Sequence, residues 1–310
     1  MSGCYVVFHK QLGDLLLMQP TFERLQAHHG GKVAVMTRGG HAPLLELMPQ
    51  PTELYQRSSV RHRSCVYCFD TLNKSAWRTI LTPAVKRYCI VPDPNELAWF
   101  HRFLFSGVIV PGLKDRYVAE YFWSNVPVPA NGEFRPPTLM KPPDTWRPPD
   151  IGDGPFLLLS PTSGWRRKSW SPYGWTAVME ALHQAGAPSA VMTSTTTPWQ
   201  LEHCDKISQR AGTSIRWLDK PTSMQNYLWL CANAEMVLSV DGSAAHLAAA
   251  FGVRNLSLFG PTSVQNWHYP TRYSRALIAR IGKDGTRRTR DLPVADVVNA
   301  ALELWAGTPS

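Results

Sequence analysis

Three polar loops, each directly after an apolar run, hold most of the side chains in this sequence that could do chemistry. The first is the segment 9–14, His-Lys-Gln-Leu-Gly-Asp. Gly13 lets the backbone turn tightly and lets a ligand approach it closely. Asp14 is expected at a helix start, where its carboxylate can act as a general base on a bound hydroxyl. The same carboxylate could instead only cap the helix by accepting backbone N–H bonds.

The second loop spans residues 160–170 and combines hydroxyls, a glycine and three consecutive cations. Donors and cations of this kind stabilise the negative charge that builds on a leaving group such as a pyrophosphate. The alternative is an ordinary solvated basic loop. The residues expected to contact such a leaving group are Thr162, Ser163, Arg166 and Lys168.

The third loop opens a helix that the sequence predicts from Gly242 to Ala250. Small residues such as Gly242 and Ser243 at a helix N-terminus leave N–H groups open to a phosphate, and the helix dipole favours negative charge there. Asp241 could cap this helix or hold a ligand hydroxyl, and His246 could contact a ligand or simply pack. A second small polar turn follows at the same sheet edge, and it contains Gly260, Pro261 and Thr262.

The elements that position these loops alternate between strands and helices, which predicts βαβ units and parallel sheets. Ligands of such sheets bind beyond the carboxyl ends of the strands, where all three loops are placed. The predicted strands are 5–8, 32–36, 66–69, 156–159, 190–192, 215–218, 236–240 and 255–259. The predicted helices are 15–25, 42–48, 75–81, 172–182, 198–210, 223–232, 242–250 and 294–305.

A proline-rich stretch between Arg135 and Pro155 interrupts the alternation at mid-chain. Such a stretch cannot form a helix or a central strand, so it predicts an extended linker. A chain of 310 residues is also long enough for two domains of roughly 150 residues each. The sequence thus predicts an α/β protein with domains 1–145 and 146–310, whose final helix, 294–305, could pack back on the first domain.

Composition excludes several classes of protein. Apolar residues make up 44% and charged residues 18%, so sizeable cores can be buried. No apolar run approaches the roughly 18 residues of a membrane span, and no signal peptide is apparent, so a cytoplasmic protein is expected. The formal charge of +9 is spread over both halves and suits an anionic partner. Neither a G-x-G-x-x-G after the first strand nor a P-loop is present, which disfavours nicotinamide dehydrogenases and P-loop nucleotidases.

Six scattered cysteines fit a reducing compartment. Cys65 and Cys68 form a C-x-x-C pair, but a zinc site would need a second pair and a redox site its own βαβ setting. Ordinary thiols near a strand are the simpler interpretation, and no metal site is expected.

Taken in order, these loops resemble the motifs of glycosyltransferase family nine, the ADP-heptose:lipopolysaccharide heptosyltransferases. The family has a G-D before an apolar helix, a K-x-W after the first strand of the second domain, and S-V-D-x-x-x-x-H-x-x-A-A followed by a strand closed by G-P-T. The weaker family stretch D-L-Q-G-x-x-K-S also has a counterpart. The matching segments here are Leu12–Leu17, Lys168–Trp170, Ser239–Ala250, Leu256–Thr262 and Phe69–Ser75.

The resemblance implies a GT-B fold, in which two Rossmann-like domains present their parallel sheets across an interdomain cleft. It implies an inverting, metal-independent transfer without a cofactor, with an ADP-sugar as co-substrate. Asp14 would then activate the acceptor hydroxyl and Lys168 would stabilise the departing diphosphate. Donor-binding roles would fall to Gly13 and to the second and third loops. Gly242-Ser243 departs from the hydroxyl-then-glycine order of many family members, which leaves the donor contacts there open.

The implied acceptor is a phosphorylated glycolipid, met at the inner face of the inner membrane through peripheral contact. The first domain is where the family binds its acceptor. The basic residues that could grip acceptor phosphates are Lys10, Arg57, Arg61 and Arg63, although a solvated positive loop remains the alternative.

Other functions stay open from sequence alone. The scaffold could use another nucleotide sugar or a non-lipopolysaccharide acceptor, or act like a UDP-N-acetylglucosamine epimerase. It could also be a non-catalytic nucleotide-sugar binding protein. A nucleic-acid binder is disfavoured, because no helix-turn-helix, zinc finger or RNA-binding signature is present.

Overall fold

The computed structural model describes residues 3–55, 63–70, 73–91, 95, 101–110, 112–113, 115–193, 197–212, 214–218 and 222–307. The chain divides into two compact units, Met1–Met140 and Lys141–Ser310. Both units alternate strands with helices, as the sequence predicts for an α/β protein.

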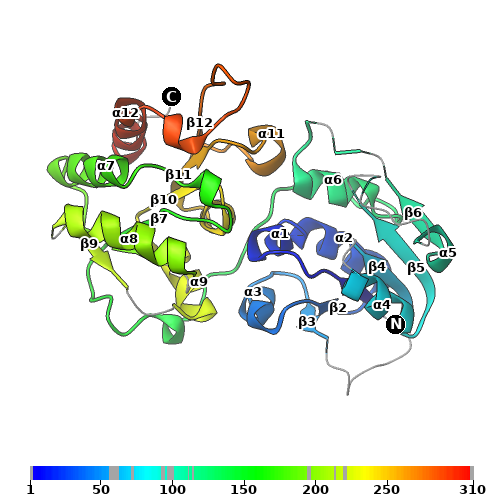
Figure 1. The fold of residues 1–310 in the computed structure, drawn as a ribbon. Helices are drawn as coiled ribbons and strands as arrows, with labels where there is room; N and C mark the ends of the chain where they lie inside the picture. Colours follow the sequence, from blue (N-terminus) through cyan, green and yellow to red (C-terminus); the bar gives the residue numbers. More distant parts are fainter. Residues whose placement is uncertain are drawn as a thin grey trace. The chain divides into compact units, whose positions relative to one another are not determined.

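The described part of the first unit contains a six-stranded parallel sheet in the order β3-β2-β1-β4-β5-β6 (Figure 1). Strand β1 pairs with both β2 and β4. The chain winds outward in opposite directions from the β1–β4 pair, and this switch point is where such sheets leave room for a ligand. The strands are β1 (Cys4–Val7), β2 (Val33–Met36), β3 (Thr52–Leu54), β4 (Arg63–Cys68), β5 (Ala84–Ile90) and β6 (Gly107–Ile109). The helices are α1 (Leu12–Leu16), α2 (Gln19–His29), α3 (Ala42–Glu46), α4 (Asn73–Leu81), α5 (His101–Leu104) and α6 (Val118–Asn125).

Two features of this unit differ from the sequence-based expectation. The strands β3, β5 and β6 were not predicted, because β3 and β6 are only three residues long and β5 begins with exposed residues. The single helix predicted over 15–25 is divided into α1 and α2. Pro20 lies in the first turn of α2, where its missing N–H costs nothing but prevents α1 from continuing through it.

The described part of the second unit contains a sheet of the same topology, in the order β12-β11-β10-β7-β8-β9. Its switch point lies between β7 and β10, which pair in parallel. Strand β12 was not predicted, because it is a short, only partly buried strand at the sheet edge, where it pairs with β11. The strands are β7 (Leu157–Ser160), β8 (Ala190–Met192), β9 (Ile215–Trp217), β10 (Met236–Val240), β11 (Arg254–Phe259) and β12 (Ser274–Ile278). The helices are α7 (Pro172–Gln184), α8 (Pro198–Ala211), α9 (Met224–Asn233), α10 (Ser243–Phe251), α11 (Val264–Trp267) and α12 (Val294–Trp305).

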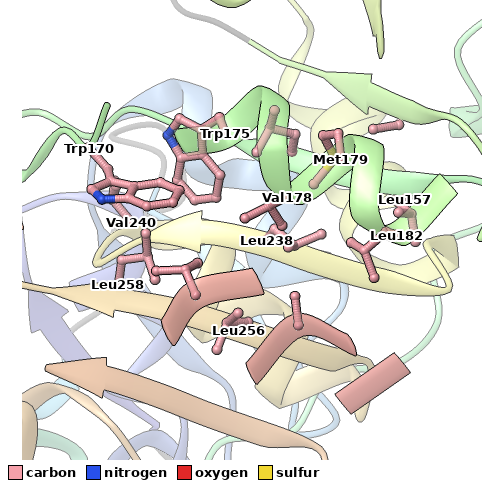
Figure 2. Close-up of a cluster of buried hydrophobic side chains, with 14 of the residues drawn as sticks. Leu157, Trp170, Trp175, Val178, Met179, Leu182, Leu238, Val240, Leu256 and Leu258 are labelled. Carbon is pink, nitrogen blue, oxygen red and sulfur yellow. The ribbon is translucent and has the colours of Figure 1, made fainter. Parts of the chain in front are cut away.

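One large apolar cluster fills one side of the second sheet (Figure 2). Side chains of β7, β10 and β11 meet those of α7, and α12 adds Val297, Ala300 and Ala301. The final helix thus buries its apolar face against α7 and β11 of its own unit. Among the described residues, no helix combines the length and apolar character that a bilayer crossing requires.

The start of α7 connects this core to the polar loop after β7. Ser171 caps the helix, because its hydroxyl accepts a hydrogen bond from the Gly174 amide at 3.2 Å, and Pro172 occupies the first turn as predicted. The indole rings of Trp170 and Trp175 meet edge to face with centroids 5.1 Å apart. The Trp170 indole N–H donates to the Leu292 carbonyl at 3.1 Å. These contacts fix the end of the loop that carries Lys168.

Gly174 is required by this packing, which generates a testable prediction. A Cβ at position 174 would lie 2.5 Å from the Trp170 ring. Gly174→Ala should therefore lower the free energy of unfolding by about 1–3 kcal/mol, because the buried indole must shift. Urea denaturation measures the effect. Gly154→Ala is the matched control, since a Cβ there meets nothing within 4 Å. Equal stability of the Gly174→Ala variant and the wild type would contradict this account of the core.

Candidate functional site

Three of the predicted residues meet at the switch point of the second sheet. Lys168 lies in a 3₁₀ turn after β7, and Asp241 directly follows β10. The Lys168 Nζ atom lies 2.6 Å from Asp241 Oδ2, and the Thr262 hydroxyl donates to the same oxygen at 2.5 Å. Asp241 is buried, with 2% of its surface exposed. Lys168 lies about 70 residues before Asp241 in the sequence, and Thr262 about 20 residues after it. Their loops converge on one carboxylate oxygen because β7, β10 and β11 are neighbours in the sheet.

The geometry leaves the ammonium group of Lys168 suited to an anion. An ammonium has three N–H donors. Within the described residues, Lys168 uses one of them on Asp241, and its Nζ also lies 5.1 Å from the centre of the Trp165 ring. Because Asp241 accepts from both Lys168 and Thr262, the cation is fixed in place before a ligand arrives. A fixed, half-buried cation can stabilise charge that develops on a phosphate oxygen.

The N-terminus of α10 lies beside this ion pair. Gly242 occupies the N-cap in extended conformation, and the Ser243 hydroxyl lies 3.1 Å from the hydroxyl of Tyr227 on α9. Burial raises the pKa of Tyr227, so its hydroxyl stays neutral at physiological pH. The first N–H groups of a helix have no partner within the helix and can bind a phosphate. Tyr227 was not among the predicted residues, and nothing in its local sequence points to the site.

Two histidines accompany Asp241. His246 lies on α10, and its ring centroid is 6.3 Å from that of Trp267 on α11. Burial lowers the pKa of His268 to about 4, and the neighbouring His246 lowers it further. His268 is therefore neutral at physiological pH and adds no positive charge beside Asp241. His268 is a second residue that sequence reasoning missed.

The remaining predicted residues of this unit also lie in the loops around the ion pair. Gln200 of α8 donates to the Ser163 carbonyl at 2.5 Å and holds the loop after β7. Gly260 directly follows β11, and a Cβ there would overlap the backbone nitrogen and the hydroxyl of Thr289. Only glycine fits there. The residues Arg166, Gly260, Pro261 and Thr262 line one cavity of this unit.

In the first unit, Asp14 lies in the first turn of α1, and its Oδ2 accepts a hydrogen bond from the Gln11 amide at 3.1 Å. The capping interpretation of this carboxylate is thereby observed, and it leaves the second oxygen for other chemistry. Gly13 is buried in the same turn, and Lys10 is half-buried in the loop between β1 and α1. Arg63 is the first residue of β4, but its side chain is not among the parts that the structure describes. Arg57 and Arg61 lie outside the described residues.

A polar network at the first switch point was missed by sequence reasoning. The buried Asp70 carboxylate follows β4 and accepts from the His9 amide at 2.7 Å, which ties the loop after β1 to β4. The His9 ring contacts the Ser75 hydroxyl through Nδ1 at 2.8 Å and an Arg78 guanidinium N–H through Nε2 at 2.6 Å. Nε2 must accept from Arg78, so Nδ1 carries the proton. Asp70 and Ser75 belong to the weak D-L-Q-G-x-x-K-S likeness, which was the available signal.

The cysteine pair behaves as ordinary thiols. Cys65 and Cys68 lie on β4, and both are buried and free of disulfides. Within the described ranges, no three His, Cys, Asp or Glu side chains are grouped closely enough to hold a metal ion.

Solved structures share this fold over nearly the whole chain. E. coli ADP-heptose lipopolysaccharide heptosyltransferase II matches with a TM-score of 0.79 at 16% identity, covering 99% of this chain and 100% of that one. A family 9 glycosyltransferase from Veillonella parvula matches with a TM-score of 0.82 at 13% identity, covering 99% and 98%. E. coli heptosyltransferase WaaC, solved with ADP-2-deoxy-2-fluoro heptose, matches with a TM-score of 0.69 at 15% identity, covering 97% and 99%. The two parallel sheets thus have the GT-B fold that the motifs implied.

Sequence comparison finds the same similarity in the second half of the chain. A curated relative, lipopolysaccharide heptosyltransferase 3 of Escherichia coli, is 28% identical over 162 residues, which is 48% of this chain. The match spans 46% of that protein, so it covers about half of its length. The profile of glycosyltransferase family 9 (heptosyltransferase) matches residues 139–290, which include the Lys168–Asp241–Thr262 cluster. The resemblance read from the motifs is confirmed, because residues 139–290 match the model of glycosyltransferase family 9 (heptosyltransferase).

Proposed function

We propose that the chain is an inverting, metal-independent glycosyltransferase that moves a heptose from ADP-heptose to a hydroxyl of a lipopolysaccharide core acceptor. The observation that carries the proposal is the Lys168–Asp241–Thr262 cluster beside the N-terminus of α10. A fixed cation and open helix N–H groups form a setting for a nucleotide diphosphate. The family 9 domain and the heptosyltransferase relative support the choice of sugar.

The proposed reaction needs one base and one stabilised leaving group. Asp14 takes the proton from the acceptor hydroxyl, and the oxygen attacks the anomeric carbon on the face opposite the diphosphate, which inverts that carbon. The bond to the diphosphate breaks, and its electrons leave with ADP. The Lys168 ammonium offsets the negative charge that builds on ADP as this bond breaks. No cofactor takes part, and ADP-heptose is a co-substrate.

We assign acceptor binding to the first domain, residues 1–145, and donor binding to the second, residues 146–310. On the donor side, the contacts proposed are with Thr162, Ser163, Arg166, Lys168, Asp241, Gly242, Ser243, His246, Gly260, Pro261 and Thr262, together with Gly13 from the first domain. On the acceptor side, the basic residues proposed are Lys10, Arg57, Arg61 and Arg63. The acceptor is a phosphorylated glycolipid, and no nucleic acid is involved.

Asp14 variants separate the base from the helix cap. Asp14→Asn keeps an oxygen that can accept the Gln11 N–H bond but cannot take a proton, whereas Asp14→Ala removes both functions. ADP release from ADP-heptose with a heptose-free lipopolysaccharide acceptor should fall about 10²–10⁴-fold in both variants. Only Asp14→Ala should also lose about 1 kcal/mol of stability in urea denaturation.

The outcomes of this assay separate the alternatives. Full turnover by Asp14→Asn would rule out Asp14 as the base. Turnover with a different nucleotide sugar, and none with ADP-heptose, would keep the transferase and reject the heptose. Donor binding without turnover for any donor would favour a non-catalytic nucleotide-sugar binding protein.

A Lys168 variant tests whether this ammonium group stabilises the departing diphosphate. Lys168→Ala should lower kcat for the same reaction about 10²–10³-fold, because the departing diphosphate loses its cation. Lys206→Ala is the matched control, since Lys206 forms only an exposed ion pair with Glu202 on α8. Circular dichroism and urea denaturation would confirm that the Lys168→Ala variant still folds when Asp241 keeps only its hydrogen bond from Thr262. An unchanged kcat in the folded variant would refute the proposed role.

Peripheral contact with the inner face of the inner membrane is part of the proposal, which would place the protein in the cytoplasm. Its support is the exposed apolar face of α4, where Trp77 and Leu81 lie one helical turn apart and are 64% and 78% exposed. Trp77→Ser with Leu81→Ser should reduce cosedimentation with anionic phosphatidylglycerol vesicles several-fold, because these side chains would insert at the interface. Tyr173→Ser on α7, which is also exposed, is the control. Equal binding of the double variant would reject this face.

A further inference from the structure

A cavity of about 870 Å³ opens in the second unit next to the Lys168–Asp241–Thr262 cluster. Three segments line it: the loop after β7, the turn after β11 and the hairpin after β12. Its volume lies in the range of small-molecule sites. The lining residues are Arg166, Arg167, Ser169, Gly260–Ser263, Ile281, Gly285–Arg288 and Arg290.

The charged side chains that line this cavity are all positive. Five arginines line it, and its lining contains no carboxylate. Two of the five are partly neutralised from outside the lining, since Arg288 pairs with Asp284 and Arg290 lies 3.9 Å from Asp291. Within the described residues, Arg287 makes no ion pair. A guanidinium group has a planar fork of donors that matches phosphate oxygens in pairs. The ligand that fits this lining is a phosphorylated small molecule.

Arg287 lies at the base of a compact hairpin, and Arg288 and Arg290 follow it closely. Ile281 and Arg287 form an antiparallel bridge, and the Gly282 amide donates to the Thr286 carbonyl at 2.8 Å. Asp284 Oδ1 accepts from the Thr286 amide at 3.1 Å and from its hydroxyl at 2.7 Å. At its far end, the hairpin segment reaches Thr289, which packs against Gly260 in the turn after β11. Binding therefore orders little additional chain, which favours affinity.

Arg166 and the turn Gly260–Thr262 belong both to this cavity and to the proposed donor contacts, whereas the hairpin side of the cavity lies apart from the remaining donor contacts. Ser163 is held by Gln200 of α8, and Ser243 by Tyr227 of α9, and these helices follow β8 and β9. The hairpin follows β12, at the opposite edge of the same sheet. Thr262 connects the two regions, because its hydroxyl donates to Asp241 while the residue also lines the cavity.

We propose that the hairpin side of this cavity, lined by Arg287, Arg288 and Arg290, binds a phosphate group of the acceptor saccharide, separately from the diphosphate of the donor. The identification of the ligand as an acceptor rests on the proposed function, whereas the phosphate site itself does not. The second unit thereby contributes to acceptor selection, beyond the basic residues proposed in the first.

Calorimetric titration of the full chain with glucose 1,6-bisphosphate, glucose and ADP tests the proposal. Arg287→Ala with Arg290→Ala should weaken binding of the bisphosphate about tenfold or more, because charge-assisted hydrogen bonds are lost. ADP affinity should stay within about twofold, and glucose should not bind detectably. Lys283→Ala is the matched control, since it removes one exposed charge from the same hairpin outside the cavity lining. If the double variant unfolds, Arg287→Gln, which keeps much of the side-chain volume, replaces it.

Three outcomes would overturn the proposal. The first is the absence of saturable bisphosphate binding by the wild type, and the second is equal affinity in the arginine variants and the wild type. The third is a parallel loss of ADP affinity, which would assign the cavity to the donor diphosphate. None of these titrations requires transfer to occur, so a failure of the heptosyl transfer assay leaves them informative.

Discussion

The ion pair between Lys168 and Asp241 is the interaction around which the second unit is arranged. A buried carboxylate without a partner would cost several kcal/mol, and Asp241 offsets this cost with two donors. Each donor arrives from a different loop, and both loops depend on the sheet: β7 delivers Lys168, and β11 delivers Thr262. Trp170 then fixes the far end of the lysine loop through its packing on Trp175 and its hydrogen bond to Leu292. The apolar core and the polar site therefore support one another.

The two units repeat one topology and place their polar groups at the same point of it. In the first unit, Asp70 after β4 binds the amide of His9 after β1, and in the second, Asp241 after β10 binds Lys168 after β7. Each contact joins the two loops that leave a switch point, where crossovers in opposite directions keep the helices apart. The first contact holds a backbone and is fully buried, whereas the second holds a cation that a ligand can reach. This difference fits a structural role for Asp70 and a chemical role for Asp241.

The positions of the positive charges in space indicate a binding site that the net charge of the chain does not. Along the sequence, the excess of Lys and Arg is spread over both halves and distinguishes little. In the structure, five arginines from two separate segments line one cavity beside the ion pair. Guanidinium groups tolerate such crowding when an anion is shared among them, which is the reason a phosphate fits there better than an uncharged ligand.

The sequence by itself determined the fold class, the resemblance to a family and most of the second unit. Strong apolar strands such as β10, the cap at Ser171 and the motif from Ser239 to Ala250 are local signals, and each was readable without coordinates. The strands β3, β6 and β12 were not predicted, because they are short or lie at a sheet edge and have only weak local signals. Apolar spacing predicted one helix over 15–25, whereas Pro20 divides this segment into two helices.

Only the tertiary structure decided which side chains meet. Asp241 could cap a helix or hold a ligand on sequence grounds, and it proved to hold Lys168 and Thr262. Tyr227, His268 and the hairpin arginines carry no local signature, because their roles come from the neighbours that strand order gives them. Periodicity is a property of adjacent residues, whereas a site is made by loops that a sheet brings together across tens of residues.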